Sequence, residues 1–132
     1  MPTTIETVTA FLGKCAEGKA ELLAAFHGYF TPQTVWENVG FSRTTGIEEA
    51  MAVIHAFEST IGACVFRAEM LAIAGEGNRV LTERIDHLID EEGKVAQSVR
   101  LMGIFEVSDG KILAWRDYFD TAGFANATSS AS

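Results

Sequence analysis

The chain has 132 residues, 48% of them hydrophobic, which suits a single domain with one packed core. Its formal net charge of -8 argues against DNA, RNA or an anionic membrane surface as a partner, because each would repel an acidic protein. No apolar stretch approaches the ~20 residues of a membrane span, and the first residues lack the features of a signal peptide. Because the only two cysteines are widely spaced, we expect the protein in a reducing cytoplasm.

Three helices are predicted in the first half of the chain. Apolar residues recur there with helical spacing, and Gly18 separates the first two helices. Thr4 is the predicted N-cap of the first helix. A short strand is expected over residues 34–39, followed by a glycine-bounded loop over residues 40–46. The predicted helices cover residues 4–16, 19–26 and 47–57.

The second half is predicted to be an antiparallel meander of four long strands. Good turn residues separate four β-like runs, and such short turns join antiparallel neighbours. Long strands curl, and a curled sheet wrapped around helices leaves a conical cavity for a small ligand. We therefore expect an α+β domain over residues 1–124 and a disordered tail at 125–132. The predicted strands cover residues 64–74, 79–89, 95–107 and 111–120.

Two of these strands carry charged residues on faces that should be buried. Arg84 and Asp86 are two positions apart, so both side chains point to the same face of their strand. Asp117 shares its face with Trp115 and Phe119. Burying a charge is costly unless it is paired. Two carboxylates and an arginine in one apolar pocket indicate acid–base chemistry on a small molecule.

Four segments of the chain resemble the limonene-1,2-epoxide hydrolase family, which has the NTF2-like (SnoaL-like) fold. That resemblance implies N-terminal helices packed in a strongly curved, largely antiparallel mixed sheet. It also implies opening of a small, mostly apolar epoxide by water in one step, without a metal or another cofactor. The segments are WENVGFSR at 36–43, LTERID at 81–86, MGIFEV at 102–107 and GKILAWRDYFD at 110–120.

The resemblance assigns roles to five residues. Asp117 is expected to be the general base that takes a proton from water, and Asp86 the general acid that protonates the epoxide oxygen. Arg84 is expected to bridge the two carboxylates, and Asn38 to orient the water. The tyrosine of the family falls on Trp36, whose indole donates one hydrogen bond and accepts none. We therefore expect a slower hydrolase or a changed substrate.

Epoxide opening needs one ionised and one protonated carboxylate at the same pH. A base must activate the water while an acid protonates the developing alkoxide, and each contributes roughly 10²–10⁴-fold. Two carboxylates in one apolar site do not both ionise easily, so their titrations couple.

Further expectations concern the substrate pocket, the subunit contact and metals. A homodimer is predicted through Leu81, Ile85 and Ile89 on the sheet face opposite the pocket. The three histidines have no metal-like spacing, so no metal site is expected. The expected substrate-binding residues are Leu88, Val99, Leu101 and Phe119 on the strands, with Leu12 and Met51 contributing from the helices.

Three other functions remain open from the sequence. In an epoxide-opening cyclase, a hydroxyl of the substrate replaces water, and the product is a cyclic ether instead of a diol. A ketosteroid-isomerase-like enzyme would need a single base and a protonated acid, which an arginine beside Asp86 does not favour. A non-catalytic binding module would tolerate Asp86→Asn and Asp117→Asn without the loss of any reaction.

Overall fold

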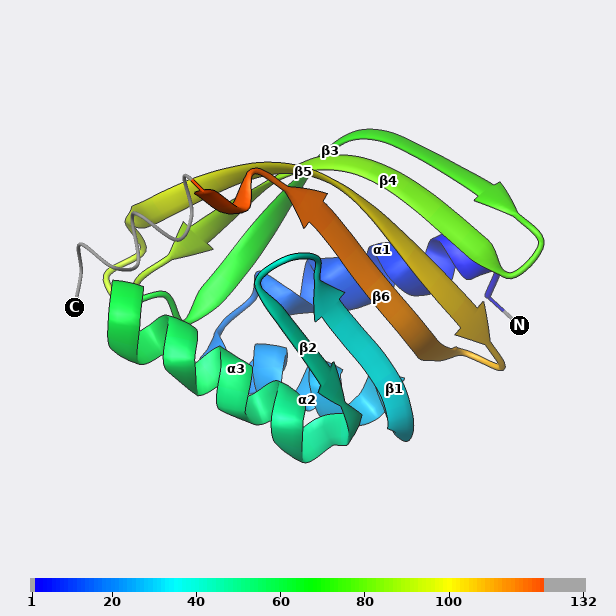
Figure 1. The fold of residues 1–132 in the computed structure, drawn as a ribbon, viewed down its shortest axis with the longest axis horizontal. Coiled ribbons are helices and arrows are strands. Elements are labelled where there is room, and N and C mark those ends of the chain that lie inside the picture. Colours follow the sequence, from blue (N-terminus) through cyan, green and yellow to red (C-terminus); the bar gives the residue numbers. More distant parts are fainter. Residues whose placement is uncertain (1, 123–132) are drawn as a thin grey trace.

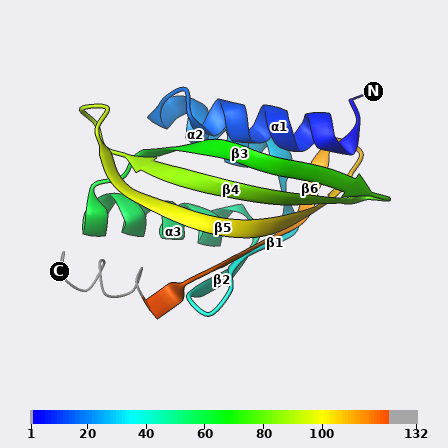
Figure 2. The same cartoon turned by 90° about the horizontal axis from the view of Figure 1, so that it is seen from above.

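The computed structural model describes residues 2–122, in which three helices lie beneath a curved six-stranded sheet (Figure 1). Helix α1 packs mainly against β3, whereas α3 packs against β1 and β2, and Figure 2 shows α1 and α2 along the β3 side of the sheet. The predicted boundary at residue 124 and the predicted tail at 125–132 lie outside the described residues. The elements are α1 (Thr4–Cys15), α2 (Lys19–Tyr29), β1 (Phe30–Asn38), β2 (Ser42–Thr45), α3 (Gly46–Ile61), β3 (Val65–Glu76), β4 (Arg79–Ile89), β5 (Val95–Ser108) and β6 (Lys111–Phe119).

The N-cap of helix α1 lies one residue before the predicted cap. Thr3 is the N-cap, and its side chain accepts a hydrogen bond from the Glu6 backbone N–H at 3.0 Å. The Glu6 carboxylate in turn accepts from the backbone N–H of Thr3 at 2.8 Å, which completes a capping box. The prediction of Thr4 as cap was therefore wrong, because the acid three positions after Thr3 selects the earlier threonine.

The region between α2 and α3 differs most from the prediction. Helix α2 continues to Tyr29, and β1 begins at once with Phe30. The predicted loop at 40–46 was wrong, because residues 42–45 form β2 and pair antiparallel with β1. A four-residue strand is too short to show a convincing alternation of apolar and polar residues.

The sheet is mixed and largely antiparallel, as predicted. Its strand order is β2-β1-β6-β5-β4-β3, and only β1 and β6 run parallel. The parallel pairing places Asn38 beside Asp117 in the register, although the two residues lie in distant parts of the sequence. This pairing brings two predicted site residues to the same end of the sheet.

Aromatic side chains fill the core between α1, α2 and the sheet. Phe11 of α1 is fully buried, and its ring contacts those of Phe26, Phe105 and Trp115 at centroid distances of 5.3, 6.5 and 5.4 Å. Trp115 of β6 also stacks on Trp36 of β1, with 5.1 Å between ring centroids. The buried polar residues described below pack directly against this aromatic cluster. Within residues 2–122, no helix has both the length and the apolar character needed to cross a membrane.

Candidate active site

The structure brings Arg84, Asp86 and Asp117 together in the interior. Arg84 and Asp86 come from β4 and Asp117 from β6, with β5 between them. Nε and Nη2 of Arg84 donate to the two carboxylate oxygens of Asp86 at 3.0 and 2.8 Å. Nη2 also donates to Oδ2 of Asp117 at 2.9 Å. The arginine therefore bridges the two acids, in the arrangement that the family resemblance implies.

A glycine on the intervening strand makes this approach possible. Gly103 of β5 pairs with Asp117 on one side and with Thr82 on the other. A Cβ at this position would collide with Oδ1 of Asp117 and would lie 2.7 Å from Nη1 of Arg84. Only a residue without a side chain leaves room for the bridge. The sequence contained Gly103 in a motif but gave no sign of this role.

Thr82 and Trp115 fix the orientation of the bridged group. Nη1 of Arg84 donates to the Thr82 hydroxyl at 2.9 Å, and this hydroxyl donates to the Gly103 carbonyl at 3.0 Å. The indole Nε1 of Trp115 donates to Oδ1 of Asp117 at 2.8 Å. Because all these groups are buried, their hydrogen bonds hold the carboxylates in one arrangement. Sequence reasoning missed both partners, since neither type of residue signals such a bond.

Burial and neighbouring charges shift the pKa of Asp117 and that of Arg84. Burial raises the pKa of Asp117 to about 6, and the nearby Asp86 acts in the same direction, against the opposing effects of Arg84 and the Trp115 hydrogen bond. Burial alone would lower the pKa of Arg84, but the charges of Asp117 and Asp86 raise it overall. The arginine therefore stays protonated, and Asp117 can exchange a proton near neutral pH.

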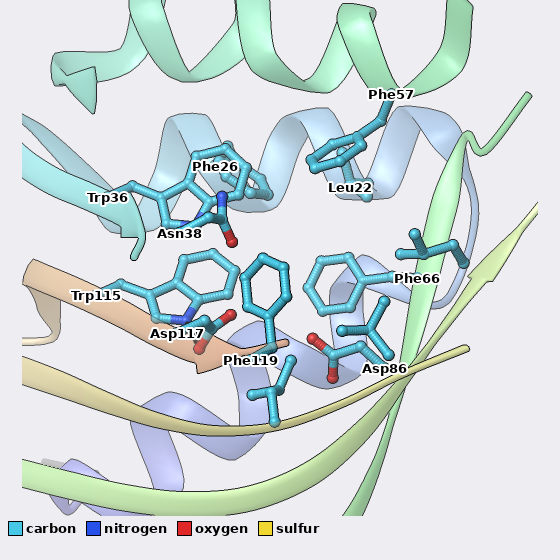
Figure 3. A pocket seen from close by; sticks show the side chains of 13 residues that line it. Leu22, Phe26, Trp36, Asn38, Phe57, Phe66, Asp86, Trp115, Asp117 and Phe119 are labelled. Atoms are coloured by element: carbon cyan, nitrogen blue, oxygen red, sulfur yellow. Dashed lines mark hydrogen bonds between the residues drawn. The ribbon is translucent and has the colours of Figure 1, made fainter. Parts of the chain in front are cut away.

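Both aspartates open onto an apolar pocket with a cavity volume of about 80 Å³ (Figure 3). Asp86, Asp117 and Asn38 are the polar residues of its wall, and the other ten lining residues are apolar. Such a cavity is smaller than the roughly 300–1,000 Å³ of sites for drug-sized ligands. Its size and composition suit a compact apolar molecule that meets two carboxyl groups at one end.

Asn38 is held with its carbonyl oxygen free to face the pocket. Its Nδ2 donates to the hydroxyl of Ser42 on β2 at 3.1 Å. In this structure the Nδ2 end of the amide faces Ser42, and Figure 3 shows the Asn38 oxygen on the side of Trp115 and Asp117. The unpredicted strand β2 therefore supplies a residue, Ser42, that orients a predicted site residue.

Trp36 lines the pocket, and its N–H is buried. The ring lies parallel to Trp115 with an interplanar angle of 16°. Its Nε1 is buried and has no hydrogen-bond partner among the described residues. The indole therefore offers the pocket an aromatic surface in this structure.

The predicted substrate-binding residues divide into two groups. Leu88, Val99, Leu101 and Phe119 all line the pocket, whereas Leu12 and Met51 do not. Leu12 is buried beneath α1, and Met51 packs against the core from α3. Helical periodicity shows which side of a helix faces inward, but not which inward residue meets the cavity. The lining residues that sequence reasoning missed are Leu22, Phe26, Phe57, Phe66 and Trp115.

Metal binding finds no support within residues 2–122. In that part of the chain, no three His, Cys, Asp or Glu side chains are grouped so that they could hold a metal ion. His87, for example, bonds Ser98 at 2.7 Å and Glu69 at 2.9 Å on the opposite face of the sheet.

Comparison with known proteins places this arrangement in a family. The family model described as "Limonene-1,2-epoxide hydrolase catalytic domain" matches residues 2–129. Epoxide hydrolase EphG of Mycobacterium tuberculosis is 41% identical over 86 residues, which cover 65% of this chain and 54% of that protein. The chain thus spans about half the length of this curated relative.

Solved structures agree on the fold. An LEH-like epoxide hydrolase from M. tuberculosis has a TM-score of 0.70 and 31% identity, over 97% of this chain and 86% of that one. An NTF2-like protein from Cytophaga hutchinsonii, at 18% identity, has a TM-score of 0.70 over 95% and 96% of the two chains. The chain therefore has the NTF2-like fold and belongs to the limonene-1,2-epoxide hydrolase family.

Proposed function

We propose that the protein opens a small, mostly apolar epoxide with water to give a vicinal diol, in one step and without a metal or another cofactor. The observation that carries this proposal is the buried Asp86–Arg84–Asp117 bridge, with both carboxylates at the wall of an otherwise apolar pocket. Family membership and the similarity to EphG support the reaction class. The apolar wall supports the choice of substrate.

In the proposed reaction, ionised Asp117 removes a proton from a water molecule that the Asn38 carbonyl oxygen helps to orient. The water oxygen bonds to one epoxide carbon while the bond from that carbon to the epoxide oxygen breaks. Asp86 gives its proton to the departing oxygen, so the product is a diol and the two acids have exchanged protonation states. Transfer of one proton from Asp117 to Asp86 restores the starting state.

The electrostatics of the bridge support a pair of acids that share one proton, and the family resemblance assigns which of them is the base. Two neighbouring carboxylates in an apolar site favour a state in which they share one proton. Arg84 is fully buried and contacts both acids, so it stabilises the negative charge on whichever acid is ionised. A pKa of about 6 leaves Asp117 largely ionised at neutral pH, as a base must be.

Isotope labelling tests the proposal directly. A single turnover in ¹⁸O-labelled water should place label in the diol, because no enzyme oxygen enters the product in a one-step reaction. Unlabelled diol in the first turnover would instead indicate a covalent ester on an aspartate. A panel of small cyclic epoxides serves as substrate, with Asp86→Asn and Asp117→Asn as inactive controls. Full activity in both variants would sink the acid–base assignment.

An epoxide-opening cyclase is the second candidate. Trp36 replaces the expected tyrosine and its N–H is buried, so one predicted anchor for water is missing while both acids are in place. A substrate hydroxyl near Asn38 would then take the place of water. Cyclic ether from an epoxy alcohol, with no diol from simple epoxides, would favour this candidate over the hydrolase.

We further propose that two copies pair through the outer face of the sheet. No described helix covers this face, and the exposed side chains of Leu81, Met102 and Tyr118 lie there on neighbouring strands. Exposed apolar groups of this kind suit a self-complementary contact. Sedimentation equilibrium should show a dimer that Met102→Lys weakens; a monomer at every concentration would contradict it.

Both cysteines are free, which supports a reducing cytoplasm as the proposed location.

A further inference from the structure

A second, smaller cavity adjoins the one that contains the carboxylates. Its volume is about 40 Å³, against about 80 Å³ for the first. Four side chains line both cavities and so form the partition between them. Three of them, Leu22, Phe66 and Leu88, come from α2 and the two strands β3 and β4, while the fourth, Phe57, comes from α3.

The second cavity continues the first along β4. Asp86 and Leu88 point to the same side of this strand, about 7 Å apart at roughly 3.3 Å per residue. Leu88 pairs with Phe66, next to Val65 and Cys64, and these last two line only the second cavity. A straight apolar chain that starts at Asp86 and passes Leu88 would therefore reach Cys64.

Phe57 is the part of the partition that α3 supplies. Helix α3 fully buries only Gly46 and Ala50, both in its first turns, and Phe57 lies in its second half. The Phe57 ring is half-buried and stacks on Phe41 in the turn after β1, with 6.3 Å between ring centroids. Figure 3 shows Phe57 projecting from α3 beside Leu22. An element with few fully buried side chains can adjust locally at low cost.

We propose that Phe57 determines the length of substrate that the site accepts, by closing one continuous apolar channel into two cavities. With Phe57 in place, the site takes compact epoxides that fit the cavity beside Asp86. Without its side chain, an unbranched tail of several methylene groups extends towards Cys64. The effect of Phe57 on substrate turnover rests on the proposed epoxide hydrolysis, whereas its effect on the binding of a long apolar chain does not.

The kinetic test compares kcat/KM for 1,2-epoxydecane and 1,2-epoxybutane. Phe57→Ala should raise the ratio of the two values by about tenfold or more, because each buried methylene contributes to discrimination. Val53→Ala is the matched control: Val53 is a half-buried residue of the same helix that lines neither cavity. Adding Ala63→Leu to Phe57→Ala should refill the second cavity, which Ala63 lines, and reverse the gain. An unchanged ratio in folded Phe57→Ala would overturn the proposal.

A binding test works even without turnover. Methyl methanethiolsulfonate should label Cys64, which lines the second cavity, but not Cys15, which is fully buried. In Phe57→Ala, 1,2-decanediol should slow labelling of Cys64 at least about tenfold, while 1,2-butanediol should not. In the wild type, neither diol should protect. Protection of the wild type by the long diol would show that Phe57 does not close the channel. Length-dependent protection without epoxide turnover would preserve this inference and contradict the proposed function instead.

Discussion

The two ends of the molecule's interior are built differently. Under α1 and α2, aromatic rings pack edge to face and in stacks, and Phe11, Phe105 and Trp115 are almost fully buried. Under α3, the apolar side chains Ile54 and Phe57 are only half-buried and face cavities. The first region supplies contacts that stabilise the fold, and the second leaves space for a ligand. Variants that change the stability of the fold without changing turnover, or turnover without stability, test this difference between the two regions.

The largest effect on chemistry is expected at Asp117. Asp117→Asn removes the proposed base but keeps an acceptor for Arg84, so kcat should fall by at least about 10²-fold with the fold intact. Circular dichroism checks that the fold is intact, and the rate of diol formation gives kcat. Glu37→Gln is a suitable control, because Glu37 lies next to Asn38 on β1 and does not line the pocket. A near-normal kcat in Asp117→Asn would show that the chemistry lies elsewhere.

The largest effect on stability is expected at Phe11. Truncation of this fully buried ring by Phe11→Ala should cost about 3–5 kcal/mol of unfolding free energy, because a cavity remains among rigid aromatic neighbours. Phe57→Ala should cost clearly less, since its ring is half-buried beside existing cavities. Urea denaturation of both variants gives the comparison. Equal losses would mean that the two regions are equally important for stability.

Gly103→Ala should disturb the site through geometry alone. The added methyl group meets Asp117 and Arg84, and neither can retreat without breaking buried hydrogen bonds. A displacement of about 1 Å at a reacting group lowers the rate by about 10²-fold. Turnover and thermal unfolding should both fall. Gly13→Ala is the control, since a Cβ there meets nothing within 4 Å, and it should leave turnover unchanged.

The smallest predicted effect is a shift in pH dependence. The proposed base must be ionised, so kcat/KM should fall as the pH drops through the pKa of Asp117, which is about 6. Trp115→Phe removes a hydrogen bond that favours ionised Asp117. The low-pH fall of kcat/KM, which is the acid limb of the profile, should therefore move to higher pH by about one unit. Trp36→Phe removes an N–H that bonds no carboxylate and should leave the limb in place. A limb that stays fixed in Trp115→Phe would contradict this account.

Much of this arrangement follows from sequence patterns. Strand alternation placed Arg84, Asp86 and Asp117 on inward faces, and the turn residues predicted the antiparallel meander. Both signals are local and repeat over many residues, which makes them strong. Family resemblance supplied what periodicity cannot, namely which buried polar residues share one site.

Other features depend on contacts that no local pattern records. Strand β2 is defined by its pairing with β1, and the position of Ser42 beside Asn38 follows from that pairing. The role of Gly103 depends on side chains from two other strands. Leu12 illustrates the opposite error: its inward position on α1 was predicted, but the residue packs away from the pocket. Such details require the tertiary structure.

The parallel pairing of β1 with β6 has a consequence for how the protein folds. Asn38 and Asp117 become neighbours only when the last of the six strands docks against the first. Contacts between distant parts of a chain form slowly, because a long loop must close before they stabilise the structure. The meander of β3 to β6, which contains Arg84, Asp86 and Asp117, can assemble through short turns, but the pairing of Asn38 with Asp117 cannot. In a refolding experiment, recovery of turnover should therefore lag behind recovery of secondary structure.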